Sequence, residues 1–213
     1  MNILYIAYSC APNQGSEDKI GWNIPLECAK TNRVYVITKE EHRDSIAQYL
    51  RENRNENISF YFVDIPGFYK KLFKGFLYSG RLNIWHRKAL SIAKEICKKH
   101  NIDIIHQITP IEFRSIGLYG MIPDIKFVCG PLGGGERLPK GLKDYAKRHR
   151  MVERLRSAMN FWAMHRRRMS HTLQNCDHVM FANHETKAYM CSVESNLSTG
   201  MVVTEIAAEQ GMT

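Results

Sequence analysis

Two glycine-containing segments carry the residues of this chain that could bind a phosphate group. One spans residues 15–17 (Gly-Ser-Glu), and the other spans residues 133–136 (Gly-Gly-Gly-Glu). Glycine lets bare backbone amides approach a ligand closely, and a helix N-terminus just beyond such a segment favours an anion. Two segments of this kind predict one shared pocket that holds a phosphorylated ligand.

Each candidate residue also has an ordinary structural interpretation. Ser16 could cap a helix, Glu17 could be a first-turn acid favoured by the helix dipole, and a lone His106 is often a satisfied core residue. Three consecutive glycines lose much backbone entropy on ordering, which favours a ligand-facing role for them. The predicted binding residues are Gly15, Ser16, Glu17, His106, Gly133, Gly134, Gly135 and Glu136.

The elements that must position these residues are strands alternating with helices. We expect strands at residues 2–10, 33–38, 58–65, 103–109, 126–129, 176–182 and 201–207. Helices are expected at 40–52, 80–100, 115–120 and 184–192, and at 21–30 with Pro25 in the first turn or at a kink. This alternation predicts an α/β fold: a Rossmann-like, doubly wound, mainly parallel sheet with helices on both faces. Both glycine segments and His106 then come at or near the carboxyl ends of strands, where ligands bind in such sheets.

Length and composition indicate an ordinary globular protein. The chain has 213 residues, which is most simply one domain, and no apolar run approaches the roughly 20 residues of a membrane span. Its six cysteines include no C-x-x-C pair and are expected to be reduced thiols. We therefore expect a cytoplasmic protein.

The net charge of +9 belongs to one segment. Residues 137–168 contain eleven Lys or Arg against two acids, and apolar residues such as Phe161 and Trp162 interleave with the cations. A solvated helix face is one interpretation. An interfacial helix that docks on an anionic membrane, at the inner face of the plasma membrane, is the interpretation we favour. The residues expected to face the membrane are Lys140, Lys143, Lys147, Arg148, Arg150, Arg154 and Arg156.

Other classes fit the sequence less well. A nicotinamide-dependent enzyme needs G-x-G-x-x-G after the first strand, where this chain offers only Gly15. A nucleic-acid-binding protein would explain the charge but leaves both glycine segments without a purpose. No spacing of His, Asp or Glu predicts a metal site, and no cofactor is predicted.

Taken in order, four segments resemble the N-terminal domain of family-four glycosyltransferases, which have the GT-B fold. They are residues 11–23, residues 103–110, Gly-Pro-Leu-Gly-Gly-Gly at 130–135, and residues 176–186. The resemblance spans essentially the whole chain and rests on the order and spacing of these segments. Some relatives have an H-x-H pattern on the fourth strand, of which this chain has His106 but Ile108 at the second position.

The resemblance implies an activity. A nucleotide-diphosphate sugar would donate a sugar to a glycan or lipid-linked acceptor, in cell-surface polysaccharide synthesis. Residues 1–213 would form the acceptor-side domain, and the C-terminal donor domain would be absent from this chain. Such a half is expected to be inactive alone. A basic module that binds an anionic membrane or nucleic acid, without catalysis of its own, is the alternative.

Overall fold

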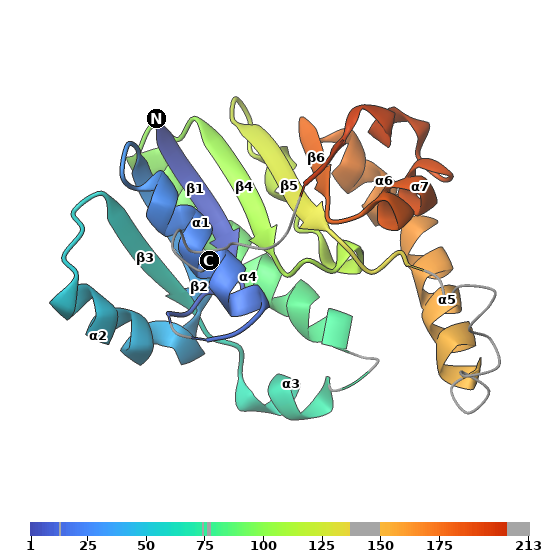
Figure 1. Cartoon of the computed structure of the whole chain (residues 1–213), viewed down its shortest axis with the longest axis horizontal. Coiled ribbons are helices and arrows are strands. Elements are labelled where there is room, and N and C mark those ends of the chain that lie inside the picture. The colour runs from blue at the N-terminus through green and yellow to red at the C-terminus, as the bar shows by residue number, and fades with distance from the viewer. Residues whose placement is uncertain (13, 74, 76–77, 137–149, 204–213) are drawn as a thin grey trace, which may run out of the picture.

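A computed structural model describes residues 1–12, 14–73, 75, 78–136 and 150–203 (Figure 1). Its strands are β1 (Asn2–Ala7), β2 (Arg33–Lys39), β3 (Ile58–Val63), β4 (Ile104–Thr109), β5 (Lys126–Leu132), β6 (His178–Phe181) and β7 (Met201–Val202). They form one parallel sheet in the order β3-β2-β1-β4-β5-β6-β7.

Helices connect the strands. The α-helices are α1 (Glu17–Cys28), α2 (Arg43–Glu52), α3 (Gly67–Leu72), α4 (Tyr78–Lys99), α5 (Arg150–Met164), α6 (Arg167–Gln174) and α7 (His184–Cys191). Single turns of 3-10 helix lie at η1 (Glu40–His42), η3 (Phe113–Ser115), η4 (Tyr119–Met121) and η7 (Ser195–Thr199).

The central strands are buried on both faces, as parallel strands covered by crossover helices must be. Along β1, Leu4 and Ile6 point into one core cluster, and Ile3 and Tyr5 point into the other. The first cluster contains buried residues of α4 through α7, and the second contains Trp22 of α1 and Ile46 of α2. Helices therefore cover both faces, and the predicted doubly wound α/β fold is confirmed.

The start of the first helix differs from the prediction. α1 begins at Glu17, four residues before the predicted start at residue 21, so Pro25 lies in its interior and is buried. A proline has no amide hydrogen, so the carbonyl of Gly21 loses its usual partner inside the helix. Contacts outside the helix hold its first turn: the amide of Ala11 donates to the carbonyl of Asp18 at 3.2 Å.

Other boundaries shift less. α4 matches the helix predicted at 80–100, and Leu82, Trp85, Ala89 and Ala93 on its inner side are fully buried. The predicted helix at 115–120 is instead the two short turns η3 and η4. The predicted last strand is described only at Met201–Val202, because residues from 204 onward lie outside the described part.

Candidate functional site

The candidate site lies along the edge where the parallel strands end. The strand order reverses between β1 and β4, so the loops after these two strands diverge to opposite faces at this point. One predicted segment, residues 15–17, follows β1. The other, residues 133–136, follows β5, next to β4.

The first segment is open. Gly15 is exposed, and an added Cβ there would meet no atom within 4 Å. Ser16 is also exposed and has φ 52° and ψ −120°, a conformation that is rare for residues other than glycine. Ser16 sits at the N-cap of α1, but its side chain makes no capping hydrogen bond. The interpretation of Ser16 as a side-chain cap is therefore wrong.

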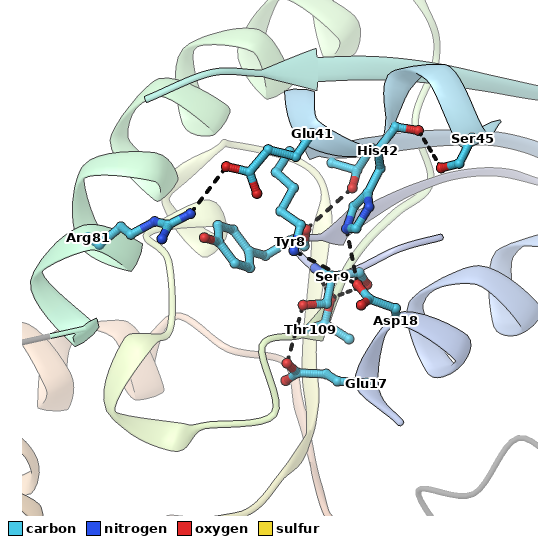
Figure 2. Close-up of polar contacts among 11 residues, drawn as sticks. Tyr8, Ser9, Glu17, Asp18, Glu41, His42, Ser45, Arg81 and Thr109 are labelled. Atoms are coloured by element: carbon cyan, nitrogen blue, oxygen red, sulfur yellow. Dashed lines mark hydrogen bonds and ion pairs between the residues drawn. The ribbon is translucent and has the colours of Figure 1, made fainter. Parts of the chain in front are cut away.

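Glu17 connects the first segment to the loop after β4. Its carboxylate accepts hydrogen bonds from the amide of Ile111 at 2.6 Å and from Ser9 Oγ at 3.3 Å (Figure 2 draws the Ser9 contact). Burial raises the pKa of Glu17 above its ordinary value, although both hydrogen bonds act in the other direction. The side chain thus has a structural role in this arrangement.

The second segment is closed by its own hydrogen bonds. The amide of Gly133 donates to the carbonyl of Ile111 at 2.8 Å. The amide of Gly134 donates to Glu136 Oε1, and that of Gly135 donates to Thr186 Oγ1, both at 3.1 Å. None of these amides is bare, so the expectation of bare amides facing phosphate does not hold for residues 133–135.

Structural reasons account for two of the three glycines. Gly134 has φ +95°, a conformation that L side chains rarely adopt. A Cβ on Gly135 would lie 2.9 Å from the Cα of Thr186, at the start of α7. Close packing and backbone conformation therefore require glycine here without reference to a ligand.

Glu136 holds the second segment in shape. Besides the Gly134 amide, its Oε1 accepts from Asn183 Nδ2 at 2.6 Å and from Thr186 Oγ1 at 3.2 Å. Partial burial alone would raise the pKa of Glu136, but the hydrogen bonds, that from Asn183 foremost, bring it below its ordinary value. Glu136 is therefore ionised at neutral pH, and its Oε1 already accepts hydrogen bonds from other groups of the protein.

Ile111 brings the two segments together. Its amide donates to Glu17 of the first segment, and its carbonyl accepts from Gly133 of the second. The two glycine segments, more than one hundred residues apart in sequence, thus lie on either side of one residue. The two segments therefore lie close together, and the phosphate pocket expected between them stays a prediction.

His106 does not reach this edge. It is the third residue of the six in β4, so its predicted place at the strand end is wrong. Its ring lies against Tyr5, with ring centroids 5.4 Å apart, and Nε2 donates to the carbonyl of Gly130 at 2.8 Å. Burial lowers the pKa of His106 to about 4, so the ring is neutral at pH 7. The ring supports the backbone just ahead of the second segment.

A polar cluster at the ends of β1, β2 and β4 was not predicted (Figure 2). Thr109 Oγ1 donates to the carbonyl of Ser9 at 2.9 Å, and Asp18 Oδ1 lies 3.0 Å from His42 Nε2. Burial alone would raise the pKa of Asp18, but contact with His42 and the charge of Lys39 lower it. The signal in the sequence was the polar run 39–42 directly after the second strand.

A hollow of about 440 Å³ lies on the α4 side of the second segment. We call it the arginine hollow; its wall includes Tyr78, Ser79, Glu112, Arg114, Arg156 and Met159. Glu112 forms a bridge with Gly133, and Arg156 donates to the carbonyl of Glu136 at 2.8 Å, so the hollow adjoins the second segment. Of this set, only Arg156 was among the predicted site residues, although Glu112 and Arg114 closely follow the fourth strand.

Arg156 corrects the predicted membrane-facing set. Its side chain is only 30% exposed and forms an ion pair with Glu153 at 2.8 Å, so it faces the protein. It lies on the same side of α5 as the buried Asn160, one turn later, whereas Arg154 faces solvent. Lys140, Lys143, Lys147 and Arg148 lie outside the described residues, as does the side chain of Arg150.

Two features are absent from the described part of the chain. The described residues contain no group of three or more His, Cys, Asp or Glu placed to hold a metal ion. Within the same ranges, no helix combines the length and apolar character needed to cross a bilayer. Models of known protein families and the sequences of curated proteins were also compared with this chain, and none of them matches it.

Proposed function

We propose that this chain is the acceptor-side domain of a glycosyltransferase that uses a nucleotide-diphosphate sugar. The acceptor is a glycan or a lipid-linked sugar, and the setting is cell-surface polysaccharide synthesis. Glycosyl transfer develops negative charge on the departing diphosphate, so the protein must place positive groups or amides beside it. The exposed backbone at Gly15 and Ser16, directly ahead of α1, offers amides of this kind beside the positive end of the helix dipole.

One observation carries this proposal: Ile111 joins the two glycine segments at the carboxyl edge, close to the topological switch point. The amide of Ile111 donates to Glu17, and its carbonyl accepts from the amide of Gly133. An open segment and a sugar-sized hollow therefore lie at one edge of the sheet. An enzyme that joins two substrates needs two adjacent subsites of this sort. The open segment suits the donor phosphates, and the hollow suits the acceptor.

Amide NMR of the full chain tests the proposal. UDP-glucose, GDP-mannose and simple methyl glycosides would be titrated separately into the labelled protein. We expect the nucleotide sugars to shift amides at residues 15–18 and the glycosides to shift amides at 112–114 and 133–136. If no nucleotide sugar and no glycoside shifts any amide at this edge, the proposal is wrong. UDP and GDP without sugar serve as controls for binding through the diphosphate alone.

A second candidate function is docking on an anionic membrane. The outer face of α5 presents an apolar stripe, with Met151 77%, Leu155 45%, Phe161 61% and Trp162 60% exposed. Leu155 and Trp162 lie four and eleven positions after Met151, which places these three side chains on one side of the helix, with Phe161 beside them. The guanidinium of the neighbouring Arg166 lies 3.6 Å from the Trp162 ring centroid. Exposed apolar residues flanked by cations are typical of interfacial helices.

A second helix, α3, also exposes apolar side chains that could contact a membrane. Phe68 and Leu72 of α3 are 69% and 51% exposed. Figure 1 shows α3 and α5 both extending past the end of the sheet where its strands terminate. Attachment through both helices would turn the candidate site toward the bilayer, where a lipid-linked acceptor is found.

Liposome sedimentation tests this second function. We expect the protein to sediment with vesicles containing phosphatidylglycerol at low salt, and to remain in solution with phosphatidylcholine alone. Replacing both Phe161 and Trp162 by serine should abolish sedimentation. Replacing Met201, an exposed apolar residue on β7, should leave it unchanged. Failure to sediment with anionic vesicles at low salt would exclude membrane docking.

A further inference from the structure

The arginine hollow has the dimensions and wall chemistry of a small-ligand site. Its volume of about 440 Å³ falls within the range of about 300–1,000 Å³ typical of such sites. Ser79 and Glu112 supply a hydroxyl and a carboxylate that can bond to sugar hydroxyls, and Tyr78 and Met159 supply apolar surface. The hollow therefore suits a polyhydroxylated ring.

The two arginines of the wall retain unused donors. Arg114 bonds to Glu112 Oε1 through Nε at 3.0 Å, and within the described residues its two terminal nitrogens make no bond inside the hollow. Arg156 uses Nη2 for Glu136 and Glu153, and its Nε is buried without a hydrogen-bond partner among the described residues. A buried donor without an acceptor is costly, so an acceptor group on a ligand would be stabilising here.

The charges of the wall favour an anion. Among the described residues, the wall has two guanidinium groups and one carboxylate, and Glu153, which pairs with Arg156, does not line the hollow. The carboxylate of Glu112 already accepts from Ser79 Oγ at 2.6 Å as well as from Arg114. The first turn of α4, a helix of 22 residues, also lines the hollow and adds the positive end of its dipole.

We propose that the arginine hollow binds the acceptor and selects acidic sugars, whose anionic group bonds to Arg114 and Arg156. The ring hydroxyls meet Ser79 and Glu112, and the apolar face of the ring packs on Tyr78 or Met159. This inference rests on the proposed function and names the substrate class of its acceptor subsite. Charge-assisted hydrogen bonds from arginine to a carboxylate are stronger than those between neutral groups.

Two matched probes test the inference on the full chain. Methyl glucuronide and methyl glucoside differ chiefly in one carboxylate, and ligand-observed NMR would give both affinities. We expect the glucuronide to bind about tenfold more tightly, as charge-assisted hydrogen bonds predict. Equal affinities would overturn the acidic-sugar inference and leave glycoside binding, and thus the proposed function, intact. Binding of neither probe would contradict both.

Single substitutions test whether Arg114 and Arg156 cause the preference for the glucuronide. Arg114→Gln and Arg156→Gln should each weaken glucuronide binding about tenfold and leave glucoside binding unchanged. Arg154→Gln, two positions away on the solvent side of α5, is the matched control and should change neither affinity. Because Arg156 also holds the carbonyl of Glu136, thermal unfolding would check each variant, and Arg114→Gln provides an independent test. An equal loss in Arg154→Gln would assign the attraction to general basicity and overturn the inference.

Discussion

The two glycine segments look alike in sequence and differ in the folded protein. At residues 15–17 the backbone is exposed, and an added Cβ at Gly15 would meet nothing nearby. At residues 133–135 every amide donates to a group of the protein itself, and α7 packs against Gly135. A run of glycines therefore indicates close backbone approach, but the approaching group can be the protein as well as a ligand.

Of the substitutions, the largest change in stability is expected from Gly→Ala, and it should differ between the two segments. Gly135→Ala places a Cβ 2.9 Å from backbone of α7 and should lower the free energy of unfolding by about 2 kcal/mol. Gly15→Ala has open space and should change it by less than about 0.5 kcal/mol. Urea denaturation of the two variants measures both values. Equal effects would remove the distinction between an open and a closed segment.

The carboxylates of the two segments should respond to pH in opposite directions. The folded-state pKa of Glu136 is lowered, so its contribution to stability is present above the unfolded value of about 4.3 and is lost as pH falls through the folded pKa. The folded-state pKa of Glu17 is raised, so its contribution is complete below about 4.3 and is lost as pH rises through the folded pKa.

Glutamine variants isolate these two contributions. Glu136→Gln should flatten the loss of stability on the acid side, and Glu17→Gln should flatten the loss above about pH 4.3. Urea midpoints from pH 2.5 to 7 would be compared with the wild type. If both variants alter the same limb of the pH profile, the assigned environments of the two carboxylates are incorrect.

A smaller effect is expected at Ser16. Its φ of 52° is unfavourable for serine and permitted for glycine, so Ser16→Gly should raise the free energy of unfolding by about 1 kcal/mol. Ser16→Ala keeps the unfavourable φ and removes no capping bond, so it should be close to neutral. A stabilising Ser16→Ala would mean that the backbone conformation is not the cause.

The last prediction concerns the protonation of His106. With its pKa lowered to about 4, the imidazole should not titrate between pH 5.5 and 8 in an NMR titration of the folded protein. The unfolded chain gains this proton near pH 6.5, so stability should fall as pH drops from about 6.5 toward 4. A titration of His106 near neutrality would indicate an exposed ring and contradict its contact with Gly130.

The fold was predictable because local periodicity encodes it. Alternating apolar residues located β1 to β6, and the spacing of Leu82, Trp85, Ala89 and Ala93 located α4. The start of α1 was placed too late because Pro25 was expected in the first turn or at a kink, whereas it lies in the interior of a helix that begins at Glu17. His106 was placed at a strand end because strand boundaries are less well defined by sequence than strand identity.

The candidate site was predictable in part. The sequence correctly brought residues 15–17 and 133–136 to one edge, because parallel strands carry their following loops to the same end of the sheet. It did not reveal the arginine hollow, whose wall comes from α4, η3 and α5. No periodicity relates Ser79, Arg114 and Arg156, so only their positions in space associate them.

The sequence by itself determined which segments are strands and helices, because the spacing of apolar residues that distinguishes them involves only residues close together in the chain. Tertiary structure decided which backbone groups remain available to a ligand. The bond between Glu17 and Ile111 joins residues 94 positions apart, and that between Gly135 and Thr186 joins residues 51 apart. A hydrogen bond depends on the distance and angle between two groups and not on their separation in sequence. Partners so far apart in the chain are therefore determined by the tertiary fold.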